Sequence, residues 1–326
     1  MTGIVDVRDL RVRFSGERTV HALNGVDIAV DEGEVLGLLG ESGSGKSVTL
    51  KALLRLLPAR RSRVSGAIRV AGRDVMALDE SALEELRGGI VSMIFQEPML
   101  ALDPVYTIGD QIAETVVRHT GASWADGRRR ALDMLERVRI PSPRRRLDSY
   151  PHEMSGGMRQ RAMIALALSC RPRLLLADEP TTALDATVQI QILLLLRELQ
   201  RELGMAVIFV THDIGVAVEI CDRIAVMYAG RIVETGTLRD VVKSPQHPYT
   251  RGLLSSTVLG ARRGQRLEAI PGAPPRLDRL PDGCAFAPRC RLAEPMCTSG
   301  DIPTVTTAPG HSARCLKLQA IAAAGA

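Results

Sequence analysis

Residues 40–47 read Gly40-Glu41-Ser42-Gly43-Ser44-Gly45-Lys46-Ser47 and fit the pattern G-x-x-x-x-G-K-[ST]. The stretch lies between an apolar run at residues 34–39, which predicts a buried strand, and residues 46–57, which predict a helix. Glycines let the backbone turn tightly, so that successive N–H groups and the helix N-terminus point at phosphate oxygens. The loop therefore predicts a nucleotide site in which Lys46 reaches the β- and γ-phosphates and the Ser47 hydroxyl ligates Mg²⁺.

A pair of carboxylates follows a second apolar run. Residues 174–177 predict a buried strand that ends at Asp178 and Glu179. Ligands of open α/β sheets bind at the carboxyl ends of strands. We expect Asp178 to act on Mg²⁺, directly or through water, and Glu179 to orient or deprotonate the water that attacks the γ-phosphate.

Three further polar residues follow strands or lie close behind them. Gln96 follows the run at residues 91–95 and could ligate Mg²⁺ or water, and His212 ends the run at residues 206–210 and could bind the γ-phosphate. Asp185 follows Glu179 closely enough to lie beside the same site. All three are predicted members of one phosphate-sensing site.

The stretch Ser155-Gly156-Gly157-Met158-Arg159-Gln160 opens a predicted helix and offers a hydroxyl and bare N–H groups to a second anion. Together with the preceding motifs, its order along residues 4–240 resembles the ATP-binding-cassette (ABC) family, with Walker A, Q-loop, signature, Walker B, D-loop and H-loop. The resemblance implies an α/β P-loop NTPase cassette, with a RecA-like core, an N-terminal antiparallel β-subdomain and a helical insertion at about residues 97–170.

The resemblance also implies which residues contact ATP. In this family two cassettes pack head to tail, so that the signature of one completes the ATP site of the other. The implied contacts within the chain are Phe14, as the adenine-stacking aromatic, and Gly40, Ser42, Gly43, Ser44, Gly45, Lys46, Ser47 and Val48. The implied contacts to the partner's nucleotide are Ser155, Gly156, Gly157 and Asp185.

The signature reads MSGGM and not the commoner LSGGQ, and His247-Pro248-Tyr249-Thr250 follows the cassette. Both features resemble the D-type ATPases of oligopeptide, dipeptide and nickel importers. That resemblance implies a second ABC ATPase as partner in a heterodimer, two permease subunits and an extracytoplasmic solute-binding protein. It also implies a C-terminal importer extension at residues 241–326, beyond a cassette at residues 1–240.

Six cysteines divide into two groups. Two are isolated in apolar surroundings and are expected to pack as small hydrophobes, and four lie near the C-terminus with the spacing C-x5-C-x6-C-x17-C: Cys170 and Cys221, then Cys284, Cys290, Cys297 and Cys315. Four thiolates can surround a metal, but this spacing selects none. The resemblance to peptide importers implies a [4Fe–4S] cluster, with zinc or unliganded thiols as alternatives.

Composition narrows the functional classes. A formal net charge of +5 permits nucleic acid or an anionic membrane as a partner without requiring either, and an aromatic content of 3% argues against stacking of bases. No apolar run approaches the ~20 residues of a membrane-spanning helix, and the N-terminus carries no apolar signal segment. The chain is therefore expected to stay in the cytosol, and the resemblance to importer ATPases implies a peripheral position at the cytoplasmic face of the membrane, with no nucleic acid as a partner.

The function expected is an ATPase that powers a peptide importer, with a nickel or other small-solute importer as the alternative. A non-transport ABC ATPase acting on nucleic acid or ribosomes is a second alternative, and an inactive ATP-binding scaffold a third. The presence of both Glu179 and His212 argues against the inactive scaffold.

Overall fold

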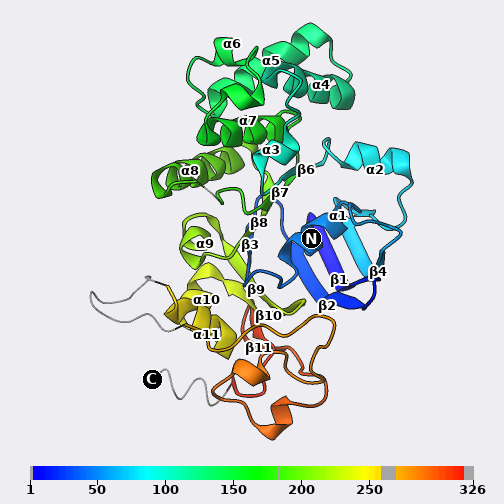
Figure 1. The fold of residues 1–326 in the computed structure, drawn as a ribbon, viewed down its shortest axis with the longest axis vertical. Coiled ribbons are helices and arrows are strands. Elements are labelled where there is room, and N and C mark those ends of the chain that lie inside the picture. Colours follow the sequence, from blue (N-terminus) through cyan, green and yellow to red (C-terminus); the bar gives the residue numbers. More distant parts are fainter. Residues whose placement is uncertain (1–2, 183, 258–268, 319–326) are drawn as a thin grey trace. The chain divides into compact units, whose positions relative to one another are not determined.

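The computed structural model describes residues 3–182, 184–257 and 269–318 (Figure 1). The chain divides into two compact units. Unit 1 comprises residues 1–4, 30–34 and 71–209. Unit 2 comprises residues 5–29, 35–70 and 210–326. Both units are therefore assembled from segments that lie far apart in the sequence, and each is described by itself.

Three neighbouring strands run through unit 1 in the order β8-β7-β6. They are β6 (Val91–Ile94), β7 (Leu174–Asp178) and β8 (Ala206–Thr211), whose last residues pass into unit 2. β6 and β7 are parallel, and β7 and β8 are buried along their whole length. Burial on both faces explains why these strands read as continuous apolar runs.

Apart from these strands and the short strand β5 (Arg73–Asp74), the regular elements described in unit 1 are helices. Between β6 and β7, residues 95–173 form helices and loops but no strand. The helices are α2 (Glu80–Leu86), α3 (Pro98–Ala101), α4 (Ile108–Thr120), α5 (Trp124–Arg137), α6 (Pro143–Arg146), α7 (Gly156–Leu168) and α8 (Ala186–Leu203), with a 3₁₀ turn η1 (Pro151–Glu153). α4 and α5 pack on each other and on α7 (Figure 1).

Unit 2 contains an antiparallel sheet formed early in the chain. Its strands are β1 (Val5–Phe14), β2 (Val20–Val30) and β4 (Ser62–Val70), in the order β2-β1-β4. Buried and exposed residues alternate along much of each strand, as expected for a sheet with one face on a core.

A second group of strands in unit 2 has the order β11-β12-β10-β9-β3. Its members are β3 (Val35–Leu39), β9 (Arg223–Tyr228), β10 (Arg231–Thr237), β11 (Val305–Ala308) and β12 (His311–Ala313). β3 and β9 are parallel, and the later strands pair antiparallel. The helices of unit 2 are α1 (Lys46–Leu53), α9 (Ile214–Ile220), α10 (Leu238–Lys243) and α11 (Pro248–Ser255), with 3₁₀ turns η2 (Ala287–Arg289) and η3 (Pro295–Cys297).

The end of α1 corrects an expectation. The apolar spacing predicted a helix to residue 57, but α1 ends at Leu53. Arg55 takes a left-handed φ of 48°, which a continuing helix does not allow. The sequence analysis also named no strand beyond residue 236, where the structure has β11 and β12.

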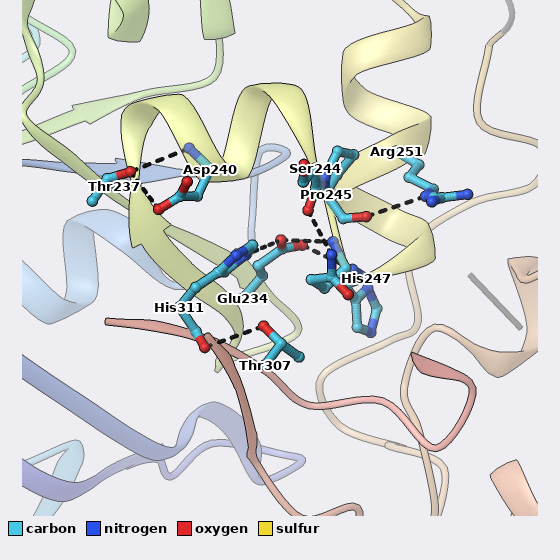
Figure 2. A network of polar contacts seen from close by, with 10 residues as sticks. Glu234, Thr237, Asp240, Ser244, Pro245, His247, Arg251, Thr307 and His311 are labelled. Atoms are coloured by element: carbon cyan, nitrogen blue, oxygen red, sulfur yellow. Dashed lines mark hydrogen bonds and ion pairs between the residues drawn. The ribbon is translucent and has the colours of Figure 1, made fainter. Parts of the chain in front are cut away.

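A buried carboxylate attaches the C-terminal region to β10. Glu234 accepts hydrogen bonds from the N–H groups of Gln246 and His247, each at 2.8 Å, and its Oε1 lies 2.8 Å from His311 Nε2 (Figure 2). One side chain of β10 therefore joins the start of α11 to β12, which pairs with the same strand.

Among the residues that the structure describes, no helix has both the length and the apolar character needed to cross a bilayer.

Candidate active site

The loop at residues 40–47 joins β3 to α1 within unit 2. A Cβ at Gly40 would lie 2.2 Å from the carbonyl oxygen of Met227, and Gly45 adopts a left-handed φ of 107° beside the carbonyl of Ala22. Both positions therefore require glycine, one for space and the other for backbone conformation. Gly43, with a φ of 79°, completes the tight turn.

Lys46 is buried inside this loop. Its Nζ donates to the carbonyl oxygens of Gly40 at 2.7 Å and of Glu41 at 3.1 Å. Gly45 is the N-cap of α1 and supplies no side-chain cap, and the first turn contains no acidic residue. The helix terminus, the lysine and the half-buried Ser47 and Val48 thus form a cationic end suited to phosphate.

The second residue of the loop has contacts that the sequence did not reveal. The Glu41 N–H donates to the Tyr249 hydroxyl at 2.9 Å, and the Glu41 carboxylate accepts two hydrogen bonds from Arg289. These partners lie 208 and 248 positions further along the chain. No sequence pattern links residues at such separations.

The end of β7 in unit 1 carries both predicted carboxylates. Asp178 is buried at the end of the strand, and Glu179 follows with a left-handed φ of 46°. Glu179 Oε2 accepts hydrogen bonds from Thr182 Oγ1 at 3.0 Å and from Gln96 Nε2 at 3.4 Å. The structure thus brings Gln96 and Glu179 together. The left-handed backbone at a non-glycine residue marks a strained position of the kind found at functional sites.

His212 is an exposed residue directly after β8. The next residue, Asp213, caps α9 by accepting from the Gly215 N–H at 2.7 Å. His212 therefore lies at a strand-to-helix turn, at the carboxyl end of β8.

Ser155 is the N-cap of α7, and its hydroxyl accepts from the Met158 N–H at 3.4 Å. Ser155 and Gly156 are exposed, and a Cβ at Gly157 would approach Val188 to 3.1 Å. The exposed glycine-rich start of α7 is suited to an anion supplied from outside unit 1, while Gly157 also serves packing.

Asp185 has a local role in unit 1. It is the N-cap of α8 and accepts from the Val188 N–H at 2.9 Å. This cap alone accounts for an aspartate at the position. Asp185 is also exposed, so its second oxygen can meet a partner.

Phe14 is half-buried at the end of β1, where it pairs with Ser62 of β4. It belongs to unit 2, as the loop at residues 40–47 does.

The predicted site residues thus fall into two sets. Unit 2 holds the loop from Gly40 to Val48, Phe14, His212 and the C-terminal cysteines. Unit 1 holds Gln96, Asp178, Glu179, Asp185 and the residues from Ser155 to Gly157.

The four C-terminal cysteines line one cavity in unit 2. Backbone N–H groups donate to three of the sulfurs: those of Phe286 and Ala287 to Cys284, that of Leu292 to Cys290 and that of Lys317 to Cys315. Burial raises the pKa of these three thiols, that of Cys315 to about 11. Without a bound cation they are therefore protonated at neutral pH.

The side chains of the predicted metal centre are not arranged as a set of metal ligands. Across residues 3–182, 184–257 and 269–318, no three His, Cys, Asp or Glu side chains form a group able to hold a metal ion. The thiols surround a cavity and do not converge on a point. Cys170 and Cys221 lie elsewhere, half-buried and buried, as expected for packing residues.

Comparison with known proteins gives two family matches. Residues 23–182 match the family described as ABC transporter, and residues 233–297 match the family described as oligopeptide/dipeptide transporter, C-terminal region.

Curated relatives extend over nearly the whole chain. A Brucella melitensis protein named for peptide import is 50% identical, over 98% of this chain and 98% of its own. The oligopeptide transport ATP-binding protein OppD of Salmonella typhimurium is 48% identical, over 96% of this chain and 93% of its own.

Solved structures agree on the fold. An ATP-binding cassette solved as a dimer with ADP and phosphate, after hydrolysis, is 31% identical with a TM-score of 0.65, covering 72% of this chain and 99% of that one. The cassette cbiO1 of Clostridium perfringens, part of the cbiONQ transporter complex, is 28% identical with a TM-score of 0.64, covering 75% of this chain and 92% of that one. The architecture is thus that of a P-loop ATPase cassette with a mixed sheet and helices.

Proposed function

The chain belongs to the ABC transporter family of ATP-binding proteins, and from that premise we propose that it hydrolyses ATP to drive the import of di- and oligopeptides across the cytoplasmic membrane. We place its cassette at residues 1–240, with a helical subdomain at about 97–170, and its importer extension at residues 241–326.

One observation carries the cargo class. The match to the ABC transporter family ends at residue 182. A second match covers residues 233–297, and its family is described as the C-terminal region of oligopeptide and dipeptide transporters. Relatives named for peptide transport span this same region. The cassette alone would support only the general activity.

ATP binds, in this proposal, at the start of α1. The loop N–H groups and Lys46 hold the phosphates, and Ser47 and Asp178 would hold Mg²⁺, which neutralises phosphate charge when bound. The buried Ser44 Oγ has no hydrogen-bond partner among the described residues, and a phosphate oxygen would supply one.

Hydrolysis is assigned to Glu179. A water attacks the γ-phosphorus, the bond to the ADP oxygen breaks, and Glu179 takes the water proton. The Gln96 amide, 3.4 Å from Oε2, and the Thr182 hydroxyl orient this carboxylate. His212 is assigned to the γ-phosphate.

A second ATPase subunit completes each site. Ser155, Gly156, Gly157 and Asp185 are exposed or half-buried on unit 1 and are assigned to the partner's nucleotide. We propose a heterodimer at the cytoplasmic face of the membrane, with two permease subunits and an extracytoplasmic solute-binding protein, and with no nucleic acid.

The cysteine cavity is proposed to hold a [4Fe–4S] cluster. Four thiols, three of which accept hydrogen bonds from four backbone N–H groups, match the ligand chemistry of such clusters. A cluster needs thiols around a cavity, whereas zinc needs them around a point, so the cluster is favoured over zinc.

The cluster is tested on anaerobically purified protein. We expect bound iron and an absorption band near ~400 nm, both lost in Cys297→Ser and retained in the control Cys170→Ser. Iron-free, colourless and fully folded wild-type protein would refute the cluster.

The import function is tested by reconstitution with the permease and the binding protein. Di- and oligopeptides should stimulate ATP hydrolysis, and Glu179→Gln should abolish the stimulated rate. If nickel stimulates ATP hydrolysis and peptides do not, the proposed cargo changes from peptides to nickel. Stimulation by nucleic acid without permease would overturn import altogether.

A further inference from the structure

Glu41, the second residue of the phosphate-binding loop, is held from the C-terminal region. Tyr249 of α11 accepts a hydrogen bond from the Glu41 N–H at 2.9 Å. Arg289 of η2 donates from Nη1 to Oε2 at 2.7 Å and from Nη2 to Oε1 at 3.0 Å. The arginine side chain is 4% exposed and that of Glu41 is 29% exposed, so this bidentate ion pair is well shielded from solvent.

Lys46 holds the other side of the same residue, because its Nζ donates to the carbonyl oxygens of Gly40 and Glu41. The Lys46 ammonium has three N–H donors, which it shares between these carbonyls and the phosphates once ATP binds. Tyr249 and Arg289 hold Glu41 through its N–H and its carboxylate, and so independently of the carbonyl that Lys46 uses.

Both anchors are themselves rigidly supported. Arg289 donates from Nε to the Pro271 carbonyl at 2.9 Å and from Nη1 to the Tyr228 hydroxyl at 3.2 Å. The rings of Tyr228, Tyr249 and Phe286 pack together with centroid distances of 4.5 to 5.4 Å. Both tyrosines are fully buried, so neither anchor can rotate away without repacking this cluster.

The helix that carries Tyr249 is also tied to the sheet. The Glu234 carboxylate of β10 accepts from the N–H groups of Gln246 and His247 at the start of α11 (Figure 2). A continuous set of contacts therefore leads from β10 through α11 to the phosphate-binding loop.

We propose that Tyr249 and Arg289 are positioning residues for the ATPase reaction: they hold Glu41 from the C-terminal region, and so keep the phosphate-binding loop in the shape that receives ATP. The C-terminal region then sets ATP affinity in addition to its proposed part in import. The proposal rests on ATP binding by the loop and not on the cargo.

The test is the Kd of MgATP, with KM and kcat, for the full-length chain. Tyr249→Phe removes one hydroxyl and leaves the ring packing, so Kd and KM should rise about threefold to tenfold. Arg289→Gln should raise them about tenfold to a hundredfold, because it removes a charge-assisted bidentate pair. At saturating ATP, kcat should stay within about twofold in both variants, since Lys46, Ser47 and Glu179 are intact.

Matched variants separate positioning from general destabilisation. Val241→Ala shortens a fully buried side chain of α10 that belongs to neither anchor, so it should lower the urea midpoint while leaving Kd within about twofold. Glu41→Ala combined with Arg289→Gln should bind ATP no more weakly than Glu41→Ala alone, because the two side chains act through each other.

The inference is overturned if Tyr249→Phe and Arg289→Gln bind ATP as tightly as the wild type while only their urea midpoints fall. Should Arg289→Gln fail to fold, Tyr249→Phe decides alone. Lys46→Ala, which should weaken ATP binding directly, keeps failure of this inference distinct from failure of the ATP-site assignment.

Discussion

Helices α1 and α7 both begin at glycine-rich sequence assigned to ATP, yet the chain surrounds the two termini differently. α1 has no side-chain cap, its first residue Lys46 is buried, and the loop before it is held by residues more than 200 positions away. α7 is capped by its own Ser155 and exposes its first residues.

This difference suits the two proposed roles: the N-terminus of α1 binds the ATP of its own chain, and the N-terminus of α7 contacts the ATP of the partner chain. The start of α1 has no side-chain cap and is held by residues from elsewhere in the chain, which suits a ligand bound by the N–H groups of the loop. The start of α7 carries a cap from Ser155 and is accessible, which suits a surface that acts only after a second chain arrives. Binding and hydrolysis should therefore be separable by mutation.

The variant Glu179→Gln is expected to separate ATP binding from ATP hydrolysis most strongly. ATP still binds at α1, but the carboxylate that accepts the water proton is gone, so kcat should fall about 10²–10³-fold. With two chains held by unhydrolysed ATP, the closed dimer should accumulate on size-exclusion chromatography with MgATP. The exposed Glu219→Gln on α9 is the control and should hydrolyse ATP normally. Near-normal turnover in Glu179→Gln would refute the assignment of this carboxylate.

The variant Lys46→Ala is expected to have a smaller effect, and on the affinity for ATP instead of on kcat. Removing a charged donor to phosphate should raise the Kd of ATP about tenfold to a hundredfold, measured by titration calorimetry. The exposed Lys51→Ala in the same helix is the matched control. Equal affinity in Lys46→Ala and the wild type would remove the functional distinction drawn between the two termini.

The support of the α1 loop should also weaken in acid. Full burial lowers the pKa of His247 to about 3, so the folded state keeps its ring neutral while the unfolded state titrates near its ordinary value. Between these values the unfolded chain binds more protons, so stability falls as the pH drops below about 6.5. The loss reaches about 1.4 kcal/mol at pH 5.5.

His247→Asn provides the control for that pH dependence. His247 Nδ1 accepts from the Tyr249 N–H as the N-cap of α11, and asparagine keeps an acceptor there without titrating. The variant should be less stable at neutral pH, because it loses ring packing against Phe286, but its stability should fall less between pH 7 and 5.5. Identical slopes of urea stability against pH in the two proteins would contradict a neutral buried histidine.

Whether the sequence could predict a feature depends on how far apart its residues lie along the chain. The α1 loop was predictable because all of its residues are contiguous and its glycines are required locally. Tyr249 and Arg289 were not, because a single tyrosine and a single arginine carry no periodic signal that names a distant partner. The four cysteines that the spacing grouped line one cavity, but the spacing did not show that Arg289, next to Cys290, pairs with Glu41 of the loop.

Local errors have local causes. α1 was expected to reach residue 57, since apolar spacing continues there, but spacing does not report the left-handed turn at Arg55. β11 was missed because all four of its residues are exposed and show no alternation. Asp185 was predicted for a partner's nucleotide, and the structure adds a cap on α8 that a sequence motif does not distinguish from such a role.

The smallest effect is expected at the start of α7, and it tests the comparison from the other side. Ser155→Ala removes the cap and should lower stability by about 1 kcal/mol, while the Kd of ATP for the single chain stays unchanged. Ser155→Asp restores a cap and favours the helix dipole, so stability should return. Its added negative charge, however, should repel the partner's phosphates and prevent ATP-driven dimerisation. If Ser155→Asp dimerises with ATP as the wild type does, the exposed end of α7 does not meet nucleotide in trans, and its cap is purely structural.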